Sequence, residues 1–148
     1  HDMPPAQHNQ IALAAEQLDV AIQLFLDERS DISALTLAGA AEEILGNAAK
    51  LAGGENALQR AYKVSALTHY YLHDKELKWP DFADGENCAR NAAKHLQSNR
   101  DTQITVDLRR AAMEMIVRAC ANFDQLGLER TDRMRDFENW FYEYEVGV

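Results

Sequence analysis

The side chains of this chain that are best suited to acid–base chemistry occur together between positions 90 and 95. Roughly one and a half turns of an expected helix contain Arg90, Asn91, Lys94 and His95. Successive residues of a helix turn by about 100°, so residues four apart are neighbours and these four side chains share one side. The opposite side carries small or apolar residues, namely Ala89, Ala92, Ala93 and Leu96. We therefore predict that the polar group points away from the core, toward solvent, a partner or a substrate.

The chemistry open to these residue types is phosphate binding and proton transfer. An imidazole can accept or donate a proton near neutral pH. A guanidinium can hold the charge of a phosphate with its fork of N–H donors. The alternative interpretation is a solvated helix face with one boundary histidine, which is common in globular proteins.

The charge distribution favours a small or selective anionic ligand. The chain has a net charge of −9, which argues against non-specific coating of nucleic acid. Residues 86–135, however, hold nine basic and seven acidic side chains and are net basic. A local cationic patch can bind a phosphate while the remainder of the molecule repels a long polyanion.

Other catalytic or metal-binding patterns are weak. His69 and His73 have the spacing at which two imidazoles share a metal, but no further ligands accompany them, so we predict neither a metal nor a cofactor. No glycine-rich phosphate loop, nucleophile elbow or Cys-x-x-Cys occurs. Cys88 and Cys120 are predicted to be buried, reduced thiols.

Apolar residues at helical spacing predict an all-α, single-domain bundle of five to six helices over residues 1–148. Residues 1–6 are interpreted as disordered or partly tag-derived, so His1 is excluded as a ligand. No apolar run is long enough to span a membrane and no signal peptide is recognised, so we expect a cytoplasmic protein. The expected helices cover residues 7–28, a segment from a cap at Asp31 or Ser33 to the glycines at 53 and 54, then residues 55–78, 86–98, 106–127 and 132–144.

The third expected helix delivers the chain to the Arg90 region. Its inward stripe is predicted to contain Leu58, Val64, Leu67 and Tyr71. Trp79 and Pro80 are expected to end it, and residues 81–85 to form a loop. Residues 99–105 are expected to connect the Arg90 helix to the next one.

The second expected helix contains a glycine and two carboxylates of interest. Gly39 costs about 1 kcal/mol relative to alanine inside a helix, which indicates that a backbone or ligand approaches closely there. Glu42 and Glu43 lie off the apolar stripe. They are interpreted as solvated flank residues, with the alternative that they pair with Arg90.

The fifth expected helix is apolar on two sides, which places it either at the centre of the bundle or against another subunit. Its polar side carries Arg110, Glu114 and Arg118, which we interpret as a structural ladder of residues four apart. The last helix ends in an acidic and aromatic cluster. That cluster is interpreted as closure of the core, with a protein-binding patch as the alternative.

The Arg90 region resembles the signature of the HEPN superfamily, in which an Arg and a following polar residue precede a His by a few positions. Here the matching residues are Arg90, Asn91 and His95, with four residues between the arginine and the histidine. The wider run of residues 35–46 and the pattern Phe137-x-x-Trp140-Phe141 add to the resemblance, which extends from about residue 10 to 145.

The resemblance implies a helical bundle that dimerises so that two motif helices face each other. Many members of the superfamily are metal-independent RNases, whereas others bind nucleotides or act as inactive scaffolds. On this basis Arg90, Asn91 and His95 are the candidate catalytic residues and Lys94 the candidate substrate-binding residue. The predicted function is a homodimer with a phosphate-facing composite site that cleaves RNA or binds nucleotides. The alternative is a non-catalytic helical module that binds a protein partner.

Overall fold

The computed structural model describes residues 3–95 and 102–147. This part of the chain is all-α and contains no strand, which confirms the predicted fold class. The helices are α1 (Gln10–Leu26), α2 (Asp31–Leu51), α3 (Ala57–His73), α4 (Trp79–Lys94), α5 (Leu108–Asp124) and α6 (Asp132–Trp140), followed by the π-helical turn η1 (Phe141–Val146). None of these helices is long and apolar enough to cross a membrane.

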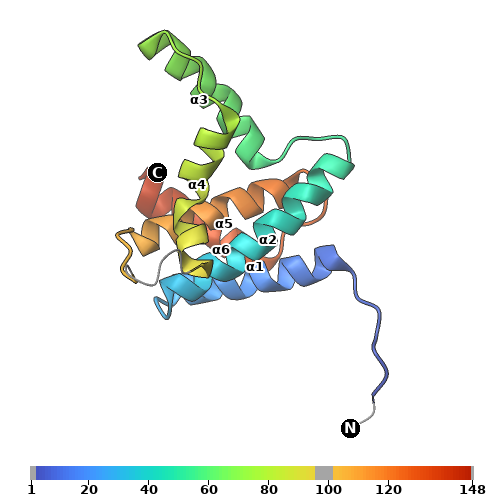
Figure 1. Ribbon diagram of the computed structural model, residues 1–148. Coiled ribbons are helices and arrows are strands. Elements are labelled where there is room, and N and C mark those ends of the chain that lie inside the picture. The colour runs from blue at the N-terminus through green and yellow to red at the C-terminus, as the bar shows by residue number, and fades with distance from the viewer. Residues whose placement is uncertain (1–2, 96–101, 148) are drawn as a thin grey trace.

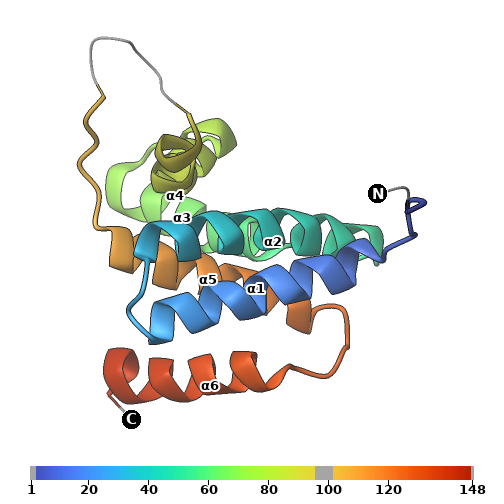
Figure 2. The same ribbon diagram turned by 90° about the horizontal axis from the view of Figure 1, so that it is seen from below.

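Four helices, α1, α2, α5 and α6, form the body of the molecule, and α3 and α4 leave it as a hairpin (Figure 1). Seen from below, α1, α2, α5 and α6 run side by side, while α4 lies beyond α2 on the side opposite α6 (Figure 2) and packs against α2 and α5. The helices α1 and α2 pack closely because their shared face is rich in alanine. The fully buried alanines of that face include Ala14, Ala21, Ala34, Ala38 and Ala41.

The helix starts follow from local capping groups. The cap of α2 is Ser30 and not the predicted Asp31 or Ser33: the side chain of Ser30 accepts a hydrogen bond from the backbone N–H of Ser33. Asn56 and Gln59 form a reciprocal capping box at the start of α3. These side chains satisfy backbone donors that have no partner inside the helix.

The helix α5 lies at the centre of the bundle, which is one of the two positions predicted for it. Both of its apolar sides are buried: Ala112, Met115 and Ala119 on one, and Met113, Ile116 and Phe123 on the other. It packs against α1, α2, α3 and α4.

The C-terminal aromatic residues close one side of the core. The Phe25 ring of α1 packs edge-on against Phe137 and Trp140, with ring centroids 5.9 and 4.9 Å apart. The Arg109 guanidinium lies over the Phe25 ring, 4.0 Å from its centre, and 5.8 Å from the centre of the Trp140 ring. Core closure is therefore confirmed for Phe137 and Trp140. Tyr142 and Tyr144 of the same cluster are exposed.

The predicted inward stripe of α3 is wrong for all but one residue. Leu58 is buried, whereas the side chains of Val64, Leu67 and Tyr71 are 69%, 60% and 78% exposed. The physical reason is that only the first turns of α3 reach α5, and the rest of the helix projects beyond the bundle with α4 as its neighbour (Figure 1). The apolar stripe is therefore exposed instead of packing against the core of the bundle.

The predicted loop between α3 and α4 is also wrong. Trp79 and Pro80 begin α4 rather than ending α3, and residues 81–85 are helical. Proline is well tolerated in the first turn of a helix, because its missing N–H would lack a helical partner there. The reversal occurs earlier, at Asp74, whose φ of 52° places it in the left-handed region. Residues 96–98, predicted to continue α4, and residues 99–101 of the predicted connection lie outside the described residues, as do residues 1 and 2.

Candidate functional site

Arg90 does not share the outward side of α4 with the rest of its motif. Its side chain is only 16% exposed and lies against α2, beside the core-facing residues Ala89 and Ala93. On a helical wheel Arg90 lies about 60° from Ala93 and about 140° from His95, so it belongs to the packed side. The prediction that all four polar side chains point away from the core is therefore wrong for Arg90.

The inward position of Arg90 creates a buried ion cluster with Glu42 and Arg118. The Nη1 atom of Arg90 donates to Oε2 of Glu42 at 3.1 Å, and Nη2 of Arg118 donates to Oε1 at 3.0 Å. Glu42 itself is 4% exposed. One carboxylate thus faces two guanidinium groups, and the cluster carries a net charge of +1.

Gly39 makes room for this arrangement. A Cβ atom at position 39 would lie 2.7 Å from Cδ and 3.1 Å from Cγ of Arg90. Any larger residue would therefore press on the aliphatic stem of the arginine. The close approach expected at Gly39 is real, and the approaching group is the Arg90 side chain.

Two asparagines connect the cluster to neighbouring helices. Asn87 of α4 accepts a hydrogen bond from Nη1 of Arg118 at 3.0 Å. The fully buried Asn122 of α5 donates to the backbone oxygen of Glu42 and accepts from the backbone N–H of Ala57 at 2.7 Å. The cluster therefore ties α2, α3, α4 and α5 together at one point.

Sequence reasoning found part of this cluster. The alternative that pairs these glutamates with Arg90 is confirmed for Glu42, whereas Glu43 is a solvated flank residue as predicted. The role of Arg118 was missed. The predicted ladder holds only between Arg110 and Glu114, at 3.5 Å, because Arg118 turns to Glu42 instead.

The other three motif residues lie at the C-terminal end of α4. Asn91 is partly buried, and Lys94 and His95 are exposed. The backbone N–H of His95 caps the helix by donating to the carbonyl of Asn91 at 3.0 Å. Cationic side chains at this end also interact favourably with the helix dipole. The imidazole of His95 is exposed and accessible to a ligand, but it lies roughly one and a half turns from Arg90.

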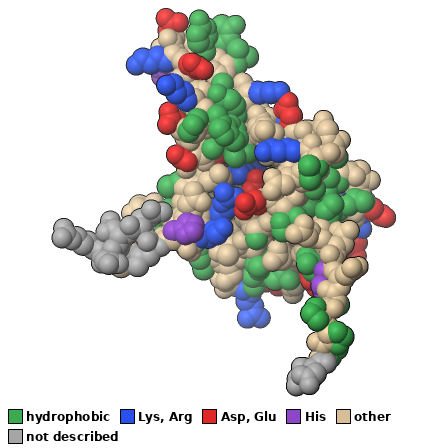
Figure 3. Space-filling view, turned by 45° about the vertical axis from the view of Figure 1, so that its right-hand side comes forward, with side chains coloured by type: hydrophobic (Ala, Val, Ile, Leu, Met, Phe, Trp, Pro, Cys, Tyr) green, Lys and Arg blue, Asp and Glu red, His purple; other side chains and the backbone are tan. Residues whose placement is uncertain are grey.

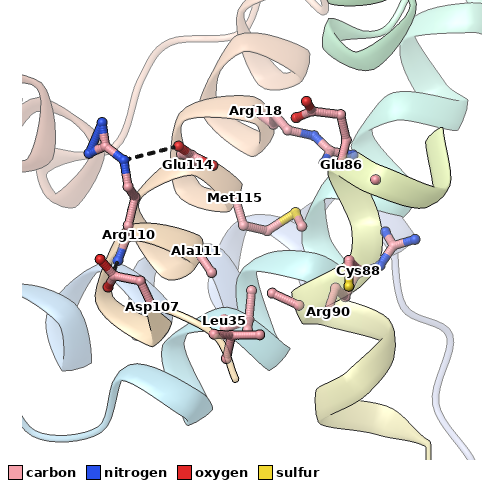
Figure 4. A pocket seen from close by; sticks show the side chains of 13 residues that line it. Leu35, Glu86, Cys88, Arg90, Asp107, Arg110, Ala111, Glu114, Met115 and Arg118 are labelled. Carbon is pink, nitrogen blue, oxygen red and sulfur yellow. Dashed lines mark hydrogen bonds and ion pairs between the residues drawn. The ribbon is translucent and has the colours of Figure 1, made fainter. Parts of the chain in front are cut away.

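A cavity of about 320 Å³ lies between α4 and α5, and Arg90 and Arg118 line it. Figure 4 shows Met115 projecting from α5 toward α4 inside this space, with Arg110 near Asp107 and Glu114 at the α5 side. A second hollow of about 170 Å³ lies on the α2 side and includes Glu42, Lys50 and Asn87. Arg90 and Arg118 line both spaces, so the ion cluster separates them.

The two arginines keep unused donors at this position. The Nε atoms of Arg90 and Arg118 are buried and have no hydrogen-bond partner in the described structure. A buried N–H donor without an acceptor costs about 1–3 kcal/mol. An anion that accepted from these groups would recover that cost.

The remaining candidate groups show no metal geometry. The His69 and His73 rings contact each other, with centroids 4.8 Å apart. Across the described residues, no cluster of three or more His, Cys, Asp or Glu side chains could hold a metal ion.

The two cysteines differ from each other. Cys88 is exposed, so its predicted burial is wrong: it lines the open cavity between α4 and α5. Cys120 is buried as predicted, and desolvation raises the pKa of its thiol to about 12. Both thiols are free.

Comparison of the chain with known protein families, curated proteins and solved structures found no match. The resemblance of the Arg90 region to the HEPN superfamily therefore stays a prediction.

Proposed function

We propose that the chain is a HEPN-like homodimer that binds the phosphate of RNA or a nucleotide at the end of α4 and cleaves RNA without a metal. The observation that carries this proposal is the ion cluster of Arg90, Glu42 and Arg118. It holds a net positive charge and two Nε–H groups without acceptors, and the exposed Lys94 and His95 follow on the same helix, about one and one and a half turns beyond Arg90.

His95 is the proton-transfer group of the proposed reaction. Its imidazole accepts the proton of a ribose 2′-OH, so that the 2′ oxygen attacks the adjacent phosphorus. The P–O5′ bond breaks as the new P–O2′ bond forms, and the leaving 5′ oxygen takes a proton from water. The products are a 2′,3′-cyclic phosphate and a 5′-hydroxyl. Lys94 attracts the phosphate, and Asn91 supplies an amide that can bind a phosphate or ribose oxygen.

Arg90 reaches the phosphate by exchanging partners. In the free protein its guanidinium is bound to Glu42, so one ion pair must break before Arg90 can stabilise the transition state. The second pair, between Arg118 and Glu42, keeps the buried carboxylate neutralised during this exchange. Removing both partners would leave an uncompensated buried charge, which is far more costly.

A homodimer fits the angular separation within the motif. Arg90 faces α2, and His95 lies at the outer end of the same helix. Side chains about 140° apart on one helix converge poorly on one phosphate. A second copy can supply the missing group across a two-fold axis, so the proposed site is composite.

Cleavage of a mixed RNA pool tests the proposal. His95→Ala removes the proton-transfer group, and we expect the rate to fall by about 10²- to 10⁴-fold with an unchanged melting temperature, because His95 is exposed. Wild-type products should end in a 2′,3′-cyclic phosphate, and added EDTA should leave the rate unchanged.

The matched control is His8→Ala, which removes another exposed histidine from the segment that precedes α1 and should leave cleavage intact. Equal loss in both variants, or an RNA pool left uncut by the wild-type protein, would contradict the RNase proposal.

The second candidate is a non-catalytic interaction module, and the engagement of Arg90 favours it. A guanidinium held by a buried carboxylate can be wholly structural. In that case Arg90→Ala lowers the melting temperature, and neither it nor His95→Ala changes nucleotide or RNA binding.

A further inference from the structure

The hollow on the α2 side of the ion cluster lies where the hairpin meets the bundle. The helices α2 and α4 and the start of α3 supply its sides, and Arg118 reaches it from α5. Glu42 and Arg90 also line it, so the ion cluster forms one part of its wall. Figure 3 shows Lys and Arg side chains together with Asp and Glu side chains at this junction, below the hydrophobic surface of the hairpin.

An exposed tryptophan forms another part of the wall. Trp79, the first residue of α4, lines the hollow and is 38% exposed. The rings of Tyr62 and Phe82 contact its ring, with centroids 5.3 and 6.2 Å away. A neighbouring hollow of about 370 Å³, lined by Tyr62 and Lys63, also reaches Trp79, so there is space beside the ring. An aromatic ring that its neighbours hold in place can stack on a flat ligand at a low cost in conformational entropy.

The charged side chains of the hollow have a small excess of positive charge. They are the three cations Lys50, Arg90 and Arg118 and the two carboxylates Glu42 and Glu43. The side chain of Lys50 is exposed and forms no hydrogen bond or ion pair with another described residue. Its ammonium group is therefore available to an anion that enters the hollow.

An aromatic ring beside cations is the combination with which proteins bind single-stranded nucleic acid, because a base stacks on the ring and the cations attract the backbone. We propose that this hollow binds one nucleotide of a single-stranded RNA, with its base stacked on Trp79 and its phosphate attracted by Lys50. The exposed amide of Asn47, in the same hollow, can bond to the edge of the base. Only an unpaired nucleotide offers a free base for this contact.

The inference rests on the proposed function, because it takes RNA as the ligand, and it adds the place where a base is recognised. Trp79 lies about 16 Å from Arg90 along α4. The base on Trp79 therefore belongs to a nucleotide that neighbours the reacting phosphate. Since the excess of positive charge is small, the stacked ring supplies most of the affinity of this site.

The fluorescence of Trp79 tests the stacking. The chain has two tryptophans, so Trp140→Phe leaves Trp79 as the only one. A short single-stranded RNA with a 2′-deoxy substitution at each site, which is not cleaved, is titrated into this variant. We expect saturable quenching by the stacked base. The matched control is an oligonucleotide of the same length with an abasic site at every position, which should bind more weakly and leave the fluorescence unchanged.

Substitution of the ring tests its share of the affinity. Trp79→Ala should weaken binding of the labelled oligonucleotide by about 5- to 150-fold, the range for the loss of one stacked base. Trp79→Phe keeps an aromatic surface and should recover most of the loss. Fluorescence anisotropy of the oligonucleotide measures both. Equal loss in the two variants would mean that stacking is not what Trp79 contributes.

Two exposed charges of the hollow provide a test that leaves the contacts of Trp79 intact. Lys50→Gln should weaken binding by about 2- to 5-fold, and Glu43→Gln should strengthen it by a similar factor. Lys50→Gln should also lower the slope of log Kd against log salt concentration by about 0.7. The matched control is Lys75→Gln, which removes an exposed cation from the turn between α3 and α4, outside the hollow, and should bind as the wild type does.

The outcomes separate the base site from the proposed function. An oligonucleotide that binds without quenching Trp79, and as tightly with abasic sites as with bases, would overturn the base site, whereas loss of cleavage in His95→Ala would still support the RNase. Equal binding by the three charge variants would place the phosphate elsewhere and overturn the inference. An oligonucleotide that does not bind the wild-type protein would overturn both proposals.

Discussion

Two consecutive carboxylates of α2, Glu42 and Glu43, have opposite surroundings. Glu42 is buried between two arginines, whereas Glu43 is exposed to solvent. Neighbouring residues on a helix point about 100° apart, so one can face the junction of α2, α4 and α5 while the other does not. The sequence alone could suggest that Glu42 pairs with Arg90, but it could not distinguish the two glutamates, because the rotation of α2 against α4 depends on tertiary packing.

The different surroundings predict different effects on stability. Glu42→Ala leaves two buried guanidinium groups without their carboxylate, and we expect the free energy of unfolding to fall by about 3–5 kcal/mol. Glu43→Ala is the matched control and should change it by less than about 0.5 kcal/mol. Urea unfolding followed by circular dichroism measures both. Equal small effects would mean that the ion cluster contributes nothing to the fold.

The cysteines allow a second prediction at the same scale. Because burial raises the pKa of Cys120 to about 12, its thiol stays protonated and shielded at pH 8, whereas Cys88 is exposed. Iodoacetamide should therefore modify one thiol per native chain, at Cys88, and both only after unfolding. Mass spectrometry of the labelled peptides identifies the site. Rapid labelling of Cys120 in the native protein would contradict its burial.

The same thiol predicts a loss of stability at high pH. The raised native pKa means that the unfolded chain loses this proton first, starting near the ordinary value of 9.0. The contribution of Cys120 to stability is complete below about pH 9 and declines as the pH rises toward 12. A Cys120→Ala variant should show a shallower decline over this window, which denaturant unfolding at several pH values can measure.

The packing of a helix was predictable from the sequence where its apolar side packs on the core of the same chain. The centrality of α5 follows from its two apolar sides, and the core role of Phe137 from its place on an amphipathic last helix. The orientation of α3 was not predictable in the same way. Its stripe is a genuine helical pattern, but periodicity cannot say whether the surface that covers it belongs to the same chain. Pro80 was misread because proline suits both the residue after a helix and the first turn of the next one.

Glycine substitutions test the contact between α2 and α4. Both Gly39 and Gly85 lie inside helices, where alanine normally adds about 0.5–1 kcal/mol of stability. A Cβ at Gly85 meets nothing within 4 Å, so Gly85→Ala should raise the melting temperature. A Cβ at Gly39 would meet Cδ of Arg90 at 2.7 Å, so Gly39→Ala should lower it by displacing Arg90 from Glu42. Equal stabilisation by both changes would show that Arg90 moves aside at no cost.

At the scale of the whole molecule, a packed bundle carries a projecting hairpin. The bundle holds most of the core, whereas Leu58 is the only buried residue of α3. Regions with few buried contacts open at low free energy. Amide hydrogen exchange should therefore be slow in α2 and α5 and fast in α3 at low protein concentration. Exchange in α3 as slow as that in α2 would contradict the weak attachment of α3 to the bundle.

The partner exchange of Arg90 can be observed directly by NMR. A short, cleavage-resistant RNA with a 2′-deoxy substitution at each site is titrated into isotope-labelled protein. We expect changes in amide chemical shift that centre on Asn91, Lys94 and His95. The Nε–H group of Arg90 has no acceptor in the free protein, so its resonance should move downfield when it binds the phosphate. Arg130, whose Nε already donates to Asp124, is the internal control and should not move. Saturating RNA that leaves the resonances of Arg90 and His95 unchanged would contradict the proposed phosphate site.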